Sequence, residues 1–210
     1  MARVKICGIT SIEDALQVVD SGADAIGLVF YKKSSRYVTI DQAVEICDAL
    51  PPFITVVALF MNASSDYVHD VIADVPCDLL QFHGDESPEF CSSFSEAYIK
   101  AVAMGEGDDS EEAFDFTAYA DQYSDAKGFL IDGHAPGEAG GSGKSFDWQH
   151  IPLDYPAPII LAGGLNPDNV ASALEMADVY AVDVSSGVES APGVKDATKI
   201  QKFMQEVRSV

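Results

Sequence analysis

Eight short apolar runs, separated by helical segments, most strongly constrain what this chain can fold into. The runs are rich in Val, Ile, Leu and Phe, which is typical of strands. Strands that alternate with helices form a parallel sheet, and eight such units are the number that closes a (β/α)8 TIM barrel. The predicted strands are residues 4–7, 25–29, 54–60, 79–82, 99–104, 128–132, 159–162 and 179–182.

Capping signals mark the starts of three helical segments. Ser11 and Ser64 each stand just before a helical segment, and Pro167 after Asn166 suits a first helical position. No linker or composition break divides the chain, so we expect one catalytic barrel domain over residues 1–210. The dinucleotide fingerprint G-x-G-x-x-G is absent after the first predicted strand, which disfavours an open doubly wound sheet.

The charge balance narrows the choice of partners. The chain has 12 Lys and Arg against 34 Asp and Glu, a formal net charge of −22. Nucleic acids and anionic membranes carry phosphates that this field repels, so neither is expected as a partner. Two interpretations of the excess remain open: an ordinary solvated acidic face, and adaptation to high salt.

The cysteine and histidine spacings indicate no metal site. Neither C-x-x-C nor H-x-x-x-H occurs, so we expect reduced thiols and no bound metal. No apolar run approaches the roughly 18 residues that span a bilayer, and the first residues lack the apolar region of a signal peptide. These features predict a cytoplasmic protein.

Polar residues gather where the predicted strands end. In a TIM barrel the chemistry lies at the carboxyl ends of the strands, and alternate side chains of a strand share one face. In the first strand the two residues with polar side chains share a face, while Val4 and Ile6 point toward the helices. The polar residues at the strand ends are Lys5, Cys7, Gln81, His83, Asp132 and Asp183.

Glycine-rich loops follow the sixth, seventh and eighth predicted strands. Residues 139–146 (AGGSGKSF) resemble a nucleotide-binding P-loop, but the required spacing puts Glu138 where the first glycine should be. A carboxylate there would repel a phosphate, so we favour a phosphomonoester site made of several loops over an ATP site. The expected phosphate-binding residues are Gly141, Gly143, Gly163, Gly164, Ser185, Ser186 and Gly187.

Six motifs follow one another along the chain. They are residues 5–10 (KICGIT), 27–31 (GLVFY) with 35–37 (SRY), 81–84 (QFHG), 140–148 (GGSGKSFDW), 161–167 (LAGGLNP) and 183–189 (DVSSGVE). Together they resemble the phosphoribosylanthranilate isomerases of tryptophan biosynthesis. The resemblance implies an Amadori rearrangement of N-(5′-phosphoribosyl)anthranilate to 1-(o-carboxyphenylamino)-1-deoxyribulose 5-phosphate, without metal or organic cofactor.

The resemblance also implies a role for each site residue. Asp132 is then the general acid that protonates the furanose oxygen, and Cys7 is the general base that takes the C2′ proton. Arg36 holds the anthranilate carboxylate, a task that suits its planar fork. The remaining substrate-binding residues expected are Lys5, His83 and Asp183.

These roles set requirements on protonation. Asp132 must keep a proton, which burial or the like charge of Asp183 would favour. Cys7 must be a thiolate, which the charge of Lys5 would favour. For His83, a hydrogen-bonded structural role remains as open as a substrate contact.

Alternatives remain open from three classes. The first is another phosphate-binding barrel of amino-acid biosynthesis. Two such enzymes are disfavoured: indoleglycerol-phosphate synthase needs further lysine and glutamate catalysts, and the phosphoribosylformimino isomerase has an aspartate where Cys7 stands. A non-catalytic phosphosugar-binding barrel is the second, and a P-loop nucleotidase is the third. The sequence also does not decide whether the protein is a monomer or a homodimer. Nor does it decide whether the protein accepts the histidine-pathway substrate.

The charge excess leads to a prediction about salt. Negative charges that repel one another destabilise the folded state, and salt screens them over about 10 Å at 0.1 M. If the surface is adapted to high salt, we expect the melting temperature to rise with added KCl at fixed pH. A melting temperature that does not respond to KCl would leave the ordinary solvated face as the explanation.

Overall fold

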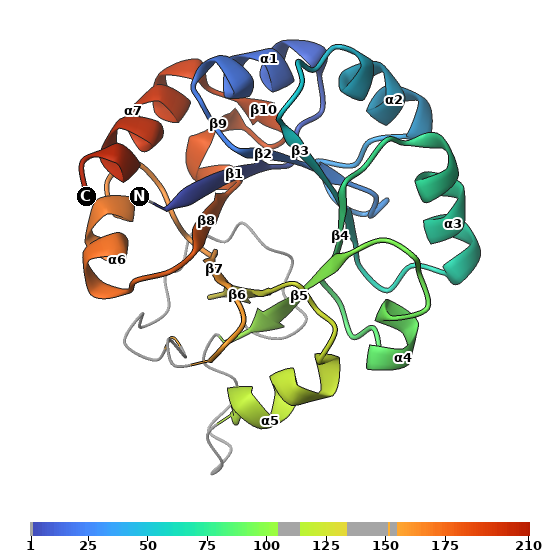
Figure 1. Cartoon of the computed structure of the whole chain (residues 1–210). Coiled ribbons are helices and arrows are strands. Elements are labelled where there is room, and N and C mark those ends of the chain that lie inside the picture. Colours follow the sequence, from blue (N-terminus) through green and yellow to red (C-terminus); the bar gives the residue numbers. More distant parts are fainter. Residues whose placement is uncertain (1, 105–113, 134–150, 152–154) are drawn as a thin grey trace.

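The computed structural model describes residues 2–104, 114–133, 151 and 155–210. Within these residues, parallel strands close into a barrel in the order β1 to β8, with helices around the outside (Figure 1). The predicted (β/α)8 TIM barrel is confirmed. The strands are β1 (Arg3–Cys7), β2 (Ala25–Val29), β3 (Thr55–Phe60), β4 (Leu79–Phe82), β5 (Tyr98–Ala103), β6 (Phe129–Asp132), β7 (Ile159–Leu161) and β8 (Ala181–Val184).

Helices follow most of these strands along the chain. Ser11 and Ser64 cap two of them as predicted, because their hydroxyls accept from the backbone N–H of Asp14 and Tyr67 at 3.1 and 3.3 Å. Most of the connection from β6 to β7 lies outside the described residues. The helices are α1 (Ile12–Asp20), α2 (Ile40–Asp48), α3 (Ser65–Asp74), α4 (Pro88–Cys91), α5 (Phe116–Ala120) with the 3₁₀ turn η1 (Asp121–Tyr123), α6 (Val170–Met176) and α7 (Ala197–Arg208).

The predicted start of α6 at Pro167 is wrong, since the helix begins at Val170. The polar side chains before it build a turn instead of a cap. The Asn166 side chain accepts from the N–H of Asp168 at 2.8 Å, and the Asn169 side chain accepts from the N–H of Asn166 at 2.8 Å. Asparagine side chains form such turns as readily as they cap helices.

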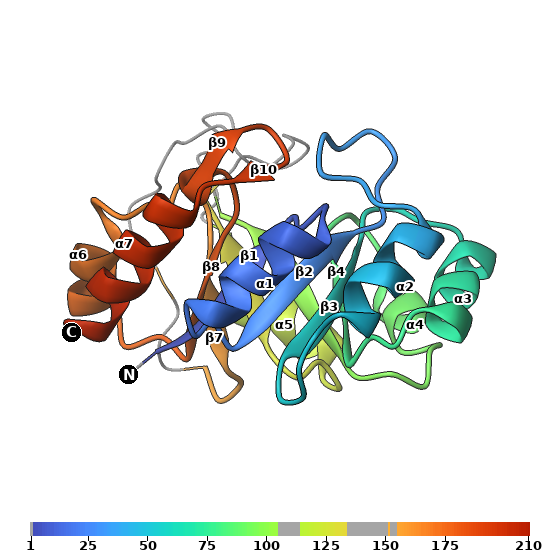
Figure 2. The ribbon, with the colours of Figure 1, turned by 90° about the horizontal axis from the view of Figure 1, so that it is seen from above.

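The last strand lies two residues later than predicted, at Ala181–Val184 rather than 179–182. Its position is set by pairing with β1, where Arg3 lies opposite Ala181. After β8 the chain forms a 3₁₀ turn, η3 (Ser186–Val188), and an antiparallel hairpin of β9 (Glu189–Ala191) and β10 (Val194–Lys195) that the sequence did not predict. Figure 2 shows this hairpin and the loop after β2 at one end of the barrel, with the N-terminus toward the other end.

Alternation along the strands separates two apolar layers. Val4 and Ile6 pack outward into the core between sheet and helices, as predicted. Ile99, Leu130 and Ile160 belong to a second cluster that fills the barrel interior. The polar side chains of Cys7, Asp132 and Asp183 lie at the C-terminal end of the barrel, beyond this inner cluster.

A buried ion pair ties the middle of β5 to the ends of β3 and β4. The Lys100 ammonium, on β5, lies 3.6 Å from the Glu86 carboxylate and donates to the backbone carbonyls of Gly84 and Ala101 at 2.6 and 3.1 Å. Glu86 in turn accepts from the backbone N–H of Asn62 and Gly84 at 2.7 and 2.9 Å. Burial lowers the pKa of Lys100, and the charge of Glu86 only partly offsets this. The pair holds the loop that follows β4.

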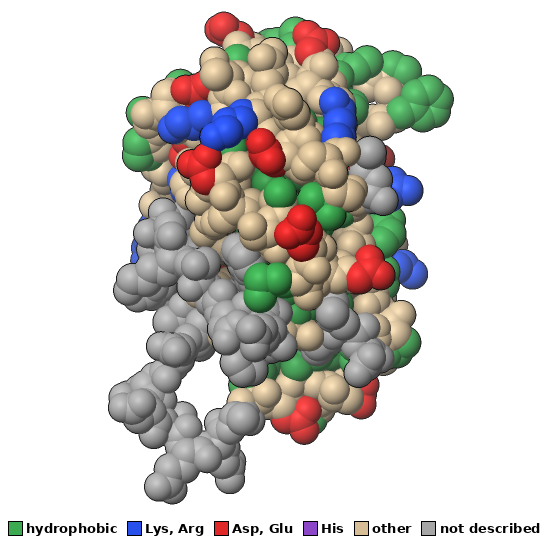
Figure 3. Space-filling model, turned by 90° about the vertical axis from the view of Figure 1, so that its left-hand side faces the viewer, with side chains coloured by type: hydrophobic (Ala, Val, Ile, Leu, Met, Phe, Trp, Pro, Cys, Tyr) green, Lys and Arg blue, Asp and Glu red, His purple; other side chains and the backbone are tan. Residues whose placement is uncertain are grey.

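One face of the molecule shows how its charged side chains are distributed. On the face shown in Figure 3, acidic and basic side chains are scattered among neutral and apolar ones. Such scatter fits a solvated acidic face, while adaptation to salt stays a prediction. In the described part of the chain no helix combines the length and the apolar character that crossing a membrane requires.

The buried pair predicts a large stability effect. Lys100→Met leaves the Glu86 carboxylate buried without its cation, and breaking such a pair typically costs about 3–5 kcal/mol of unfolding free energy. Urea denaturation followed by circular dichroism measures this loss. The control is Lys202→Met, which removes an exposed cation from a surface pair with Asp168 and should leave stability unchanged. Equal midpoints for the two variants would contradict the proposed structural role of the pair.

Candidate active site

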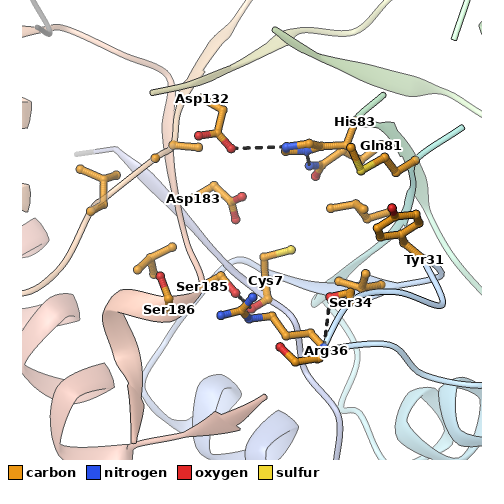
Figure 4. Close-up of a pocket in the computed structure, with 18 of the residues that line it drawn as sticks. Cys7, Tyr31, Ser34, Arg36, Gln81, His83, Asp132, Asp183, Ser185 and Ser186 are labelled. Atoms are coloured by element: carbon orange, nitrogen blue, oxygen red, sulfur yellow. Dashed lines mark hydrogen bonds and ion pairs between the residues drawn. The ribbon is translucent and has the colours of Figure 1, made fainter. Parts of the chain in front are cut away.

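A pocket of about 370 Å³ opens at the C-terminal ends of the strands (Figure 4). Residues from the ends of β1, β2, β3, β4, β6, β7 and β8, or from the loops that follow them, form its walls. Nine of the predicted site residues line it, although they lie far apart in the sequence. They are Cys7, Arg36, His83, Asp132, Gly163, Gly164, Asp183, Ser185 and Ser186.

Four predicted site residues lie elsewhere or are not described. Lys5 is buried and is not among the residues that line the pocket; its ammonium donates to Asp183 at 2.9 Å. Gly187 is packed against the loop after β7, where a Cβ would clash with the Leu165 carbonyl. Gly141 and Gly143, together with the P-loop-like residues 139–146, fall outside the described residues.

Cys7 lies at the end of β1 with its side chain toward the pocket, and only 5% of it is exposed. There is room for the thiol because its neighbour on β2 is Gly27, where a Cβ would lie 2.7 Å from Sγ. Burial raises the pKa of the thiol, and the charge of Lys5 lowers it by less. The expectation of a Lys5-stabilised thiolate therefore needs correction: Lys5 acts in the expected direction, but loss of hydration outweighs it.

Asp132 lies across the pocket from Cys7, at the end of β6 (Figure 4). Nε2 of His83 is 3.3 Å from Oδ2 of Asp132, and Nδ1 of His83 is 2.9 Å from Nε2 of Gln81. With the Gln81 amide nitrogen as the donor, Nδ1 accepts and the Nε2–H of the imidazole points at Asp132. Asp183, the expected like-charge neighbour, is paired with Lys5, so its charge is largely compensated.

Arg36 enters the pocket from the loop after β2. Its Nε and Nη2 donate to the two carboxylate oxygens of Glu189 at 2.7 and 2.8 Å, and these bonds raise the pKa of the guanidinium. The side chain crosses the end of β1 at Gly8, whose φ of +78° and lack of a Cβ allow the close approach. No described residue accepts a hydrogen bond from Nη1, so among these residues the end formed by Nη1 and the second hydrogen of Nη2 stays available for a ligand.

The loops after β7 and β8 form the wall that suits a phosphate. Gly163 and Gly164 both have positive φ values, +80° and +67°, so their backbones turn sharply at the rim. A Cβ at Gly163 would lie 2.7 Å from Oδ1 of Asp132. Ser185 and Ser186 face the same corner (Figure 4). Small residues here let backbone N–H groups and hydroxyls approach an anion.

The opposite wall is apolar. Val29 and Leu59 form a small cluster with Cys7, and Tyr31 packs against it. This wall lies beside Arg36 in the same pocket. A flat ring that carries a carboxylate fits this combination, because the ring contacts the apolar wall and the carboxylate faces a cation.

Three residues of the site received no role from the sequence. Gln81 has the strongest sequence signal, since it stands two residues before His83 and shares its strand face. Glu189 closes a recognised motif, but only the fold shows that it contacts Arg36. Lys195 lies in the unpredicted hairpin and donates to Glu189 at 2.8 Å.

The chain matches a family model described as N-(5′-phosphoribosyl)anthranilate (PRA) isomerase over residues 4–206. A protein of Pseudomonas fluorescens named N-(5′-phosphoribosyl)anthranilate isomerase is 53% identical over 207 residues, which cover 99% of this chain and 96% of the relative.

Solved structures give the same match in three dimensions. Phosphoribosyl anthranilate isomerase in complex with reduced 1-(o-carboxyphenylamino)-1-deoxyribulose 5-phosphate has a TM-score of 0.84 at 39% identity, covering 100% of both chains. A structure of monomers generated from the dimeric phosphoribosylanthranilate isomerase of Thermotoga maritima has a TM-score of 0.84 at 38% identity, again covering 100% of both chains.

The burial of Cys7 predicts how it titrates. Because burial raises its pKa above the ordinary 9.0, the thiolate absorbance that wild type shows and Cys7→Ser lacks should develop above pH 9. Lys5→Met should shift this step to still higher pH, since it removes the charge that lowers the pKa. A step at or below the ordinary value in the ligand-free protein would contradict the dominance of burial.

Proposed function

Because the chain belongs to the N-(5′-phosphoribosyl)anthranilate isomerase family, we propose that the pocket at the C-terminal end of its barrel is the active site, with Cys7 as general base and Asp132 as general acid. The protein is an isomerase of tryptophan biosynthesis that converts N-(5′-phosphoribosyl)anthranilate to 1-(o-carboxyphenylamino)-1-deoxyribulose 5-phosphate. The observation that carries the residue assignment is that Cys7 and Asp132 face one pocket from opposite strands.

The reaction needs two proton transfers at different atoms. Asp132 donates a proton to the furanose ring oxygen, the bond from this oxygen to C1′ breaks, and a Schiff base forms between C1′ and the anthranilate nitrogen. Cys7 then removes the proton from C2′, which gives an enolamine. The enolamine tautomerises to the ketone product. An acid and a base on separate walls suit this order, because neither group has to move.

The two ends of the substrate match the two ends of the pocket. The anthranilate ring lies on the wall of Val29 and Leu59, and its carboxylate meets the free end of Arg36. The 5′-phosphate lies in the corner made by Gly164 and Ser186. The charge of Arg36 at one end of the pocket and the small residues at the other end support this orientation of the substrate.

His83 supports the acid in this scheme. Its Nε2 lies 3.3 Å from the Asp132 carboxylate, so the imidazole stabilises the anion that remains after the ring opens. Asp183 and Lys5 form a neutral pair near Cys7. We therefore give Lys5 a supporting position beneath the pocket and His83 a position at its wall.

Further features of the protein are proposals with less support. A family model that spans residues 4–206 supports one catalytic domain. A catalytic thiol must stay reduced, which favours a cytoplasmic location. The relative from Thermotoga maritima is dimeric, and light scattering on purified protein decides between monomer and homodimer here.

Variants of the acid and the base test the assignment. Cys7→Ser and Asp132→Asn should each lower kcat at least about 10²-fold, since one general acid or base typically contributes 10²–10⁴-fold. The loss of anthranilate fluorescence with freshly made substrate measures turnover. Both variants should still bind the reduced product. Wild-type rates from Cys7→Ser would return Cys7 to an inert core position, and no turnover by the folded wild type would contradict the activity itself.

The pH profile of kcat/KM identifies the two groups. The active form needs Cys7 as thiolate and Asp132 protonated. Because burial raises the pKa of Cys7, the thiolate is the minor form of this residue near neutral pH. Only a minor fraction then has both groups in the required state, and the profile is bell-shaped with Cys7 on the upper limb. Lys5→Met should move this upper limb to higher pH. A shift of the lower limb alone would reverse the assignment.

A further inference from the structure

A residue that is not among those lining the pocket determines which end of the Arg36 guanidinium points into it. Glu189 takes the side of the guanidinium formed by Nε and Nη2, with bonds of 2.7 and 2.8 Å. The Arg36 side chain is 15% exposed and that of Glu189 is 5% exposed. Two parallel bonds fix the plane of the guanidinium as well as its position, so its free end can point in one direction only.

Glu189 is itself held by two lysines. The ammonium of Lys195 donates to Oε1 of Glu189 at 2.8 Å, and the ammonium of Lys199 donates to the Glu189 backbone carbonyl at 2.6 Å. Burial raises the pKa of the Glu189 carboxyl, but the bonds and charges of Arg36 and Lys195 offset this and hold it below its ordinary value. The carboxylate therefore stays ionised between its two cations.

Lys195 connects this pair to the end of β1. Its ammonium also donates to the Cys7 carbonyl at 2.7 Å and to the Ser185 carbonyl at 3.2 Å, and its side chain is fully buried. One ammonium thus joins the strand that carries the thiol, the serine loop after β8 and the partner of Arg36. These groups come from opposite ends of the sequence.

We propose that Glu189 and Lys195 are positioning residues, which aim the free end of Arg36 at the substrate carboxylate and lock it to the strand end that carries Cys7. This inference rests on the proposed function, because it assumes that Arg36 binds the carboxylate. Neither residue contacts the substrate. Their effect is on how well the protein distinguishes a ligand with the carboxyl group from one without it.

A purely structural role makes a different prediction. Loss of a buried charge pair lowers the unfolding free energy and weakens all ligands alike in proportion to the folded fraction. Loss of the correct orientation of the Arg36 guanidinium lowers the affinity only for ligands that carry the carboxylate. The selectivity between two otherwise identical ligands therefore separates the two roles.

The probes are reduced 1-(o-carboxyphenylamino)-1-deoxyribulose 5-phosphate, which is the ligand of the solved relative, and its counterpart without the carboxyl group. The ratio of their dissociation constants is measured by calorimetry. Wild type should prefer the carboxylate by about 10–100-fold, the range for a hydrogen bond to a charged group. Arg36→Ala should bring the ratio close to one, and Glu189→Gln should lower it at least several-fold.

Three further variants complete the test. Adding Glu189→Gln to Arg36→Ala should change the ratio no further, because Glu189 acts through Arg36. Lys202→Met, which removes an exposed cation of α7, is the matched control and should keep the wild-type ratio. The double variant Glu189→Gln with Lys195→Met replaces both buried charges of the pair at once, so it leaves neither of the two as an isolated ion if a single variant does not fold.

The outcomes distinguish the two proposals. If Arg36→Ala keeps the wild-type ratio, the carboxylate assignment in the proposed function is wrong. If Arg36→Ala abolishes the preference while folded Glu189→Gln, or the folded double variant, keeps it, the carboxylate assignment stands and the positioning role of Glu189 and Lys195 is overturned.

Discussion

A charge that the barrel removes from water needs a partner, and this requirement organises the site. Lys5 of β1 pairs with Asp183 of β8, and Lys195 pairs with Glu189, which holds Arg36. The Lys5–Asp183 and Arg36–Glu189 pairs join segments that lie far apart in the sequence. Lys195 and Glu189 lie in one hairpin, and the Lys195 ammonium also donates to the carbonyl of Cys7 on β1. The loop after β2, the end of β1 and the hairpin after β8 therefore form one unit, and the geometry of the pocket follows from ion pairs rather than from the loops alone.

The same burial carries a chemical cost. Val29 and Leu59 offer an aromatic ring an apolar surface, but they also surround Cys7 and help to exclude water from its thiol. The thiolate that the proposed mechanism requires is then disfavoured, and Lys5 offsets only part of this. In the proposed mechanism, the apolar wall that would bind the ring also lowers the fraction of the protein in the reactive protonation state, which accounts for the expected bell-shaped profile.

The sequence predicted the parts that depend on local pattern. Apolar runs located the strands, but in the run around 179–182 almost every residue is apolar, so alternation could not place β8, and pairing with β1 did. The hairpin that carries Glu189 and Lys195 has strands too short to leave a pattern. The side chains at the strand ends were predicted to meet because parallel strands end together. The pKa of Cys7 was not predictable, because it depends on burial by residues from other strands.

The most direct test is a crystal structure of this protein with the reduced product bound. We expect the carboxylate at the free end of Arg36, the phosphate at the loops after β7 and β8, and C2′ within about 3.5 Å of the Cys7 sulfur. Asp132 should face the opposite side of the sugar. A ligand bound in the reverse direction, with its phosphate at Arg36, or a C2′ atom beyond reach of Cys7, would contradict the account.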